Sequence, residues 1–101
     1  MTNQVIIIGR LVSDPQINET KNGNKVSTIT LAVPRSYKNV NGEYEIDFIP
    51  VRLFKVIAGQ TTNYCKKGDL VGVKGSIQRL SGEELKIVAD KVTFLSSGNK
   101  E

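Results

Sequence analysis

Hydrophobic and polar residues alternate along most of the chain, with the period of two that is typical of strands buried on one face. This pattern predicts strands at about residues 3–12, 26–33, 43–55, 70–77 and 85–95. Between residues 56 and 67 the spacing changes, and Ile57, Thr61, Tyr64 and Cys65 form a helical stripe that ends before Gly68. The predicted order is therefore β-β-β-α-β-β, and Tyr64 is expected in the core.

The segment 43–55 divides into two chemically different faces. Ile49, Val51 and Leu53 form an aliphatic side that suits a core. The opposite side carries rings and a cation at even positions, namely Tyr44, Ile46, Phe48, Arg52 and Phe54. Such a row suits unstacked nucleobases, because each base stacked on an aromatic ring contributes roughly 1–3 kcal/mol. Taken alone, the row also fits a second packing layer or a subunit interface.

Glycine and proline positions add turns and bends to this pattern. Residues 41–42, Asn-Gly, predict a hairpin between the second and third strands. Gly9 suits a sharp bend in the first strand, and Pro50 predicts an edge position or a bulge because proline has no N–H to donate. Segment 3–12 is apolar on both faces, which predicts a barrel wall that also meets another subunit. In the fourth strand Val71, Val73 and Ile77 are expected to face inward.

An all-β chain of five strands, with a helix between the third and fourth, matches the plan of the OB-fold. This fold is a five-stranded, partly open Greek-key barrel that binds oligonucleotides on the face of its second and third strands. The 101 residues suffice for one domain. We expect a single OB-fold domain over residues 1–95 and a short polar tail over residues 96–101.

Charge and hydropathy narrow the possible partners. The 14 lysines and arginines outnumber the 10 acidic residues and give a net charge of +4, which favours a polyanionic partner. The sequence has no apolar run near the ~20 residues that a membrane span needs, and it lacks the pattern of a secretory signal. We therefore expect a cytoplasmic, nucleoid-associated protein without a membrane partner.

The residue inventory argues against catalysis. The chain has no histidine and one cysteine, so a disulfide framework and a zinc site are not expected, and Cys65 is interpreted as a buried or half-buried thiol. The commonest general base is missing, and neither a nucleophile motif nor a phosphate-binding loop is present. Glu83 and Glu84 are interpreted as a solvated turn. We expect no enzyme activity, no cofactor and no small-molecule substrate.

Several longer segments resemble a known family. They are Val5–Pro15, Asn22–Gly23, Ile29–Val33, Asn41–Glu43, Asp47–Ile49 and Tyr64–Gly75. Their residues, order and spacing resemble the bacterial and phage single-stranded DNA-binding proteins over nearly the whole chain. The resemblance implies sequence-independent binding of single-stranded DNA in replication, recombination or repair. It also implies a homotetramer, with a dimer as the alternative, and leaves a chromosomal, phage or plasmid origin open.

The resemblance also places the binding residues. Tyr37, Phe48 and Phe54 fall on the family's base-stacking positions, which are often tryptophans in other members, and Tyr44 belongs to the same aromatic row. The expected phosphate contacts are chosen instead by their place on the expected outer face or by their proximity to the basic, aromatic hairpin, and they are Arg10, Arg35, Lys38, Arg52, Lys55 and Lys74.

Two departures from the family pattern change the expectation. The long, basic hairpin between the last two strands is reduced to about residues 80–84, which predicts a shorter site and weaker binding, with Arg79 as a partial substitute. The family's flexible linker and acidic tip are missing after residue 96. Recruitment of other replication proteins is therefore not expected, unless this chain is a trimmed form of a longer one.

Two rival functions share the same fold. One is an accessory subunit whose OB-fold docks a partner protein through Tyr44, Phe48 and Phe54. The other is a binder of single-stranded RNA, because no residue visibly reads a 2′-hydroxyl.

Overall fold

The computed structural model describes residues 1–82 and 84–98. The elements are β1 (Val5–Leu11), β2 (Asn18–Glu19), β3 (Lys25–Lys38), β4 (Tyr44–Phe54), α1 (Lys55–Tyr64), β5 (Leu70–Arg79) and β6 (Leu85–Ser96). The predicted order is confirmed, with one addition. The two-residue strand β2, which pairs with the start of β3, is too short to produce an alternating pattern.

The strands form a closed barrel, which confirms the all-β OB-fold. They neighbour one another in the order β1, β5, β6, β4 and β3, and β3 pairs back to β1. The barrel that was expected to be partly open closes through two short pairings. One joins β1 to β3 at Arg10 and Leu11, and the other joins β4 to β6 in parallel at Val51 and Arg52. Pro50 pairs with Thr30 of β3 and comes just before Val51, where the pairing of β4 with β6 begins. On its β6 side Pro50 therefore lies at an edge, as predicted for a residue without an N–H.

The core fills the barrel with aliphatic side chains from β1, β3, β4, β5 and β6. Its fully or almost fully buried members include Leu31, Val51, Leu53, Val71 and Val73. β1 passes very close to β3 at Gly9, where a Cβ atom would lie 2.8 Å from both Ala32 O and Val33 Cγ2. Gly9 therefore permits the close packing that the sequence predicted for a bent strand.

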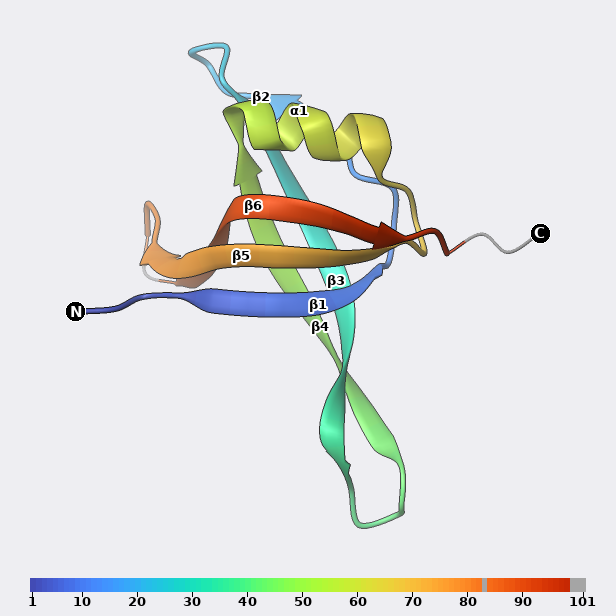
Figure 1. Cartoon of the computed structure of the whole chain (residues 1–101). Coiled ribbons are helices and arrows are strands. Elements are labelled where there is room, and N and C mark those ends of the chain that lie inside the picture. Colours follow the sequence, from blue (N-terminus) through green and yellow to red (C-terminus); the bar gives the residue numbers. More distant parts are fainter. Residues whose placement is uncertain (83, 99–101) are drawn as a thin grey trace.

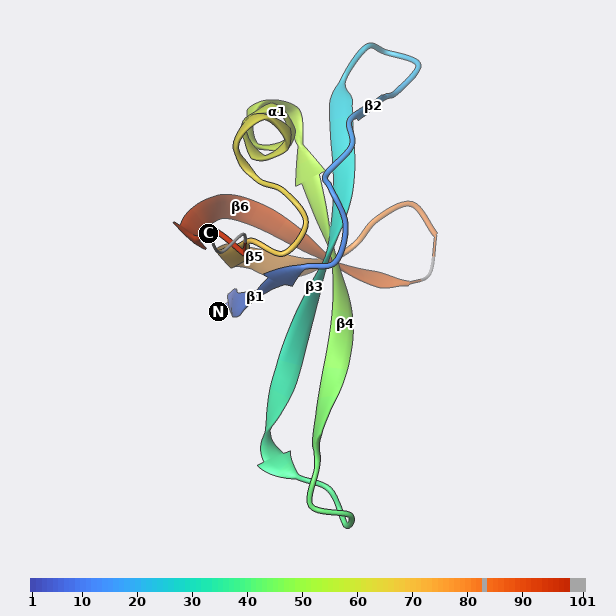
Figure 2. The same cartoon turned by 90° about the vertical axis from the view of Figure 1, so that its right-hand side faces the viewer.

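The hairpin of β3 and β4 extends beyond the barrel as a long arm, which we define as residues 34–48 (Figures 1 and 2). The predicted Asn41-Gly42 turn is confirmed. Gly42 adopts a φ of 79°, and Asn39 Oδ1 accepts hydrogen bonds from the backbone N–H groups of Asn41 and Glu43. A register shift interrupts the pairing between Pro34 and Lys38, so three residues of β3 lie opposite one residue of β4.

The helix α1 lies across one end of the barrel (Figure 1) and buries Ala58 and Thr61. Cys65, directly after the helix, is buried as predicted. The prediction that Tyr64 belongs to the core is wrong, because its side chain is 75% exposed. Tyr64 lies at the border of the stripe defined by Ala58, Thr61 and Cys65, so its ring projects past the barrel.

The inward assignment of Ile77 is also wrong. Val71, Val73 and Gly75 are buried, but Ile77 is exposed because β5 continues past the end of the barrel. Glu84 is exposed, as expected for a solvated turn, whereas Glu83 lies outside the described residues. Of the predicted tail, the structure describes residues 96–98, and the backbone N–H of Gly98 donates to Asp69 Oδ1.

Candidate nucleic-acid interface

The outer face of β3 and β4 carries the predicted aromatic row. Tyr44, Ile46 and Phe48 are all more than half exposed, and Phe48 reaches 63%, whereas Val51 and Leu53 on the other face are fully buried. The period-two interpretation of this segment is therefore confirmed. The row forms because residues two apart on a strand point to the same side.

Small side chains of β3 lie beside this row. Paired residues on antiparallel strands direct their side chains to the same face. The pairs here are Thr28 with Arg52, Thr30 with Pro50 and Ala32 with Phe48. The small neighbours leave one flank of the Phe48 ring uncovered, so a flat ligand has room beside it.

The two ends of the row differ in their setting. At the arm, Lys38 Nζ lies 5.8 Å from the centroid of the Tyr44 ring, within the range of a cation–π contact. At the barrel, Arg52 and Phe54 are half-buried. The row therefore has a cation near each end and runs from the exposed arm toward the barrel.

Arg35 lies on the opposite face of the arm. Its Nε and Nη2 atoms donate to the two carboxylate oxygens of Asp47, each at 3.1 Å, and its Nη1 atom lies 3.4 Å from Glu45 Oε1. The hydrogen bond from Arg35 lowers the pKa of Asp47, and the two carboxylates raise the pKa of Arg35 further above its already high value. Asp47 and Glu45 occupy odd positions, so this ion-pair cluster faces away from Phe48.

Tyr37 is grouped with Arg35 rather than with Phe48. Its ring is exposed, and its charge interaction adds to those of Asp47 and Glu45 that raise the pKa of the Arg35 guanidinium. Both residues occupy odd positions of β3, and alternation directs odd positions away from the face of Ala32 and Phe48. The register shift between Pro34 and Lys38 adds two residues to β3, so it leaves this alternation in phase. The structure thus brings Phe48 and Phe54 onto one face and leaves the third predicted stacking residue outside that face.

The remaining predicted basic residues are dispersed. Arg10 of β1 lies opposite Ala32 of β3, and Ala32 lies opposite Phe48 of β4. The Nη1 atom of Arg10 donates a hydrogen bond to Gly68 O at 3.0 Å. Lys74 lies opposite Ile6 of β1 and Lys91 of β6, outside the β3–β4 face. Lys55 begins α1 with a φ of 56°, which is uncommon for a residue other than glycine, and is exposed. Arg79 ends β5 opposite Leu85.

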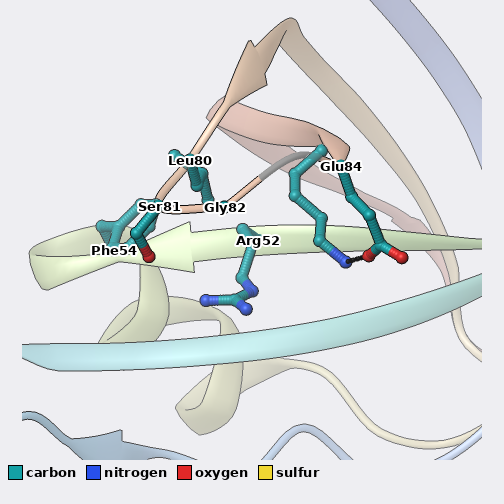
Figure 3. A pocket seen from close by; sticks show the side chains of 7 residues that line it. Arg52, Phe54, Leu80, Ser81, Gly82 and Glu84 are labelled. Carbon is teal, nitrogen blue, oxygen red and sulfur yellow. Dashed lines mark hydrogen bonds and ion pairs between the residues drawn. The ribbon is translucent and has the colours of Figure 1, made fainter.

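A cleft lies at the barrel end of the row, and we call it the Phe54 cleft. Its volume is about 510 Å³. It is lined by Arg52, Phe54, Leu80, Ser81, Gly82, Glu84 and Lys86 (Figure 3). Residues 80–82 and 84, from the shortened turn between β5 and β6, form one wall, so this turn borders the aromatic row.

The sequence profile described as the single-strand binding protein family matches residues 2–95. The chain belongs to this family. The match covers the whole barrel, the arm and the Phe54 cleft, and it confirms the resemblance that the sequence segments indicated.

Similar proteins support the same membership. Single-stranded DNA-binding protein B of Bacillus subtilis (strain 168) is 41% identical over an alignment that covers 100% of this chain and 96% of the relative. Single-stranded DNA-binding protein 2 of Staphylococcus aureus (strain COL) is 42% identical, with 98% of this chain and 77% of the relative covered. Single-stranded DNA-binding protein 1 of Staphylococcus aureus (strain MSSA476) is 38% identical, with 100% and 70% covered.

Other site chemistries find little support in this member of the family. Within residues 1–82 and 84–98, the acidic residues and Cys65 form no cluster of three or more that could hold a metal ion. Burial raises the pKa of the Cys65 thiol, which keeps it protonated and unreactive. In the same ranges, no helix is both long and apolar enough to cross a membrane.

Lys86 is the cleft residue that the sequence interpretation missed. Its Nζ atom lies 3.1 Å from Glu84 Oε1, and both residues line the Phe54 cleft. The sequence contained one weak signal of this position, because Lys86 is a basic residue that comes soon after the shortened turn at residues 80–84. Its approach to Arg52 depends on how β6 meets β4, which no local pattern reveals.

Proposed function

We propose that this chain binds single-stranded DNA, without reading its sequence, on the outer face of β3 and β4. The observation that carries the proposal is the exposed row of Tyr44, Ile46 and Phe48. Exposing three large apolar side chains side by side is unfavourable in water unless a ligand covers them. Unpaired bases suit this role, because their flat faces stack on aromatic rings whatever their sequence.

Membership of the single-strand binding protein family supports the same ligand, as do relatives that are named single-stranded DNA-binding proteins. We infer that the protein acts by binding and protecting the strand in replication, recombination or repair, in the cytoplasm beside the nucleoid. This is a role without catalysis, which agrees with the lack of histidine in the sequence. It requires neither a cofactor nor a small-molecule substrate.

The strand would follow the row from the arm to the barrel. Bases stack on Phe48 and Phe54, and Tyr44 extends the surface toward the tip of the arm. Arg10, Lys38 and Arg52 are the basic residues nearest this path and contact the phosphates. Lys55, Lys74 and Arg79 contact a strand that continues past the ends of the row. Tyr37 and Arg35 lie on the opposite face of the arm, so they contact a strand that wraps around it.

The outer face of β1 supports assembly into an oligomer. Ile6 and Ile8 are exposed there, although β1 already contributes Ile7 and Leu11 to the core. A strand that is apolar on both faces is typical of one buried from both sides. We infer a homotetramer, with a dimer as the alternative, in which this face is covered by a second copy of the chain.

The experiment that tests the proposed site compares two aromatic substitutions. Phe48→Ala removes a ring from the row, and Tyr64→Ala removes another exposed ring from the end of α1. Loss of one stacked base should weaken binding of a labelled thymidine oligomer about 5- to 150-fold in Phe48→Ala. Tyr64→Ala should bind like the unchanged protein.

The melting temperature of both variants should stay close to that of the unchanged protein, because neither ring is part of the core. Equal binding by all three proteins would refute the proposed site. Weak binding by the unchanged protein itself, insensitive to salt, would favour a protein partner on this face. Tighter binding of a matched RNA oligomer would favour RNA as the ligand.

A further inference from the structure

The Phe54 cleft contains an ion pair that faces the barrel end of the aromatic row. Lys86 Nζ and Glu84 Oε1 are 3.1 Å apart, and Arg52 and Phe54 form the neighbouring wall. Figure 3 shows the ion pair as a dashed line from Glu84, in the cleft that Arg52 and Phe54 also line. Two cations and one carboxylate thus border a single cleft next to an aromatic ring.

The strand register explains why Lys86, and not Arg79, joins Arg52 as a basic residue of this cleft. Lys86 lies opposite Gln78, and Arg79 lies opposite Leu85. Neighbouring residues on a strand point to opposite faces, so Lys86 and Arg79 are on opposite sides of the β5–β6 hairpin. Of these two basic residues, only Lys86 lines the cleft beside Arg52.

We propose that the Phe54 cleft takes one nucleotide of the bound strand, that Lys86 contacts its phosphate together with Arg52, and that Glu84 competes with the phosphate for Lys86. This inference rests on the proposed single-stranded DNA function and assigns a new contact and a built-in competitor to the same site. The volume of about 510 Å³ lies within the range of roughly 300–1,000 Å³ that is usual for small-ligand sites.

The exposure of the two partners decides which of them moves. The Glu84 side chain is 81% exposed and the Lys86 side chain is 33% exposed. Glu84 can swing into water at little cost, whereas most of the Lys86 side chain is already covered and stays in the cleft. An arriving phosphate therefore replaces the carboxylate and leaves the lysine where it is.

The test is a double-mutant cycle on oligomer binding, with Glu84→Gln, Lys86→Gln and the double variant. Glu84→Gln removes the competitor and should tighten binding of a thymidine oligomer about two- to fivefold at low salt, the size expected for an exposed ion pair. Lys86→Gln should weaken binding and reduce the log–log salt slope by about 0.7, the value for one single-strand phosphate. Lys86→Arg keeps the positive charge and should restore the salt slope that Lys86→Gln loses.

The decisive result is the double variant. If Glu84 acts by holding Lys86, Glu84→Gln should give no gain once Lys86 is glutamine. An equal gain in both backgrounds would mean that Glu84 only repels DNA at long range, and it would overturn the proposal. Asp90→Asn and Lys91→Gln make the same charge changes further along β6, outside the residues that line the cleft. They should change binding by less than twofold.

Phe48→Ala, measured in the same series, separates this inference from the proposed function. If Phe48→Ala weakens binding but the Lys86 and Glu84 variants show no coupling, the cleft assignment is wrong and the aromatic row remains the site. If the unchanged protein does not prefer single-stranded over duplex DNA, both the function and the cleft assignment are wrong.

Discussion

Arg35 and Asp47 form a two-pronged ion pair, with both N–O distances at 3.1 Å, on the face of the arm opposite Phe48. The pair lies at the start of the register shift between Pro34 and Lys38, with Arg35 inside the shift and Asp47 opposite Val33 just before it. The ion pair therefore links β3 to β4 at a point where the ladder of backbone hydrogen bonds between them is interrupted. It also engages the guanidinium of a residue that the sequence suggested as a phosphate contact.

Asp47→Asn should release Arg35 for DNA. An uncharged partner holds the guanidinium less firmly, so we expect tighter binding of a thymidine oligomer at low salt. The log–log salt slope should steepen by up to about 0.7, because one more phosphate is neutralised. Fluorescence titration at several salt concentrations measures both quantities. Glu43→Gln, with the same charge change in the same arm, is the control, and weaker binding in Asp47→Asn would show that the pair instead positions Tyr37 for the ligand.

The same pair should contribute to stability in a defined pH range. The pKa of Asp47 is lowered from about 3.8 by the hydrogen bond from Arg35. A carboxyl whose pKa is lower in the folded chain stabilises the fold above the pKa of the unfolded chain, and this contribution is lost as the pH falls through the folded-state value. The difference in melting temperature between the unchanged protein and Asp47→Asn should be constant from pH 7 to 5 and shrink below about pH 4. A constant difference down to pH 2.5 would contradict this account.

Gly9→Ala should destabilise the barrel. The added Cβ would lie 2.8 Å from Ala32 O and Val33 Cγ2, and forcing β1 away from β3 costs about 1–3 kcal/mol. A domain of this size should lose about 4–8 °C in melting temperature for each kcal/mol. Gly59→Ala is the matched control, because no atom lies within 4 Å of its added methyl group and alanine favours the helix. Equal melting temperatures for the two variants would show that β1 and β3 are not packed this closely.

Ile8→Lys should weaken self-association. Its side chain is exposed on the outer face of β1, where a second copy of the chain is proposed to pack. A buried unpaired lysine would be strongly unfavourable in such an interface, so light scattering after size exclusion should give a smaller mass than for the unchanged protein. Val40→Lys, at an exposed apolar position near the tip of the arm, should leave the mass unchanged. An unaltered mass in Ile8→Lys would place the interface elsewhere.

Local patterns predicted the fold and the aromatic face because both depend on alternation. The sequence separated Phe48 from Val51 and Leu53 correctly, since a strand has only two faces. Arg35 and Tyr37 are odd-numbered like Ile29 and Leu31, so alternation along β3 already directs them away from Phe48. Tyr37 was placed with the stacking residues by the family resemblance, and not by this pattern. The register shift between Pro34 and Lys38 adds two residues to β3, so it leaves the alternation in phase.

The other errors concern where the core ends and which distant segments meet. Tyr64 and Ile77 follow the correct periodicity, but they lie past the limits of the barrel, which depend on how far neighbouring elements extend. Lys86 was overlooked because the Phe54 cleft arises where the turn between β5 and β6 approaches β4. Contacts of this kind come from the closed topology of the barrel and leave no local signal in the sequence.

Binding of single-stranded DNA on the β3–β4 face is tested most directly by titrating a labelled thymidine oligomer at low and moderate salt, with matched duplex as competitor. We predict tight binding that weakens as salt is added, with a log–log slope of about −0.7 for each phosphate neutralised. We also predict that duplex does not displace the bound oligomer. Duplex competes poorly because its bases are already stacked on one another. Weak binding, or equal displacement by duplex, would contradict the account.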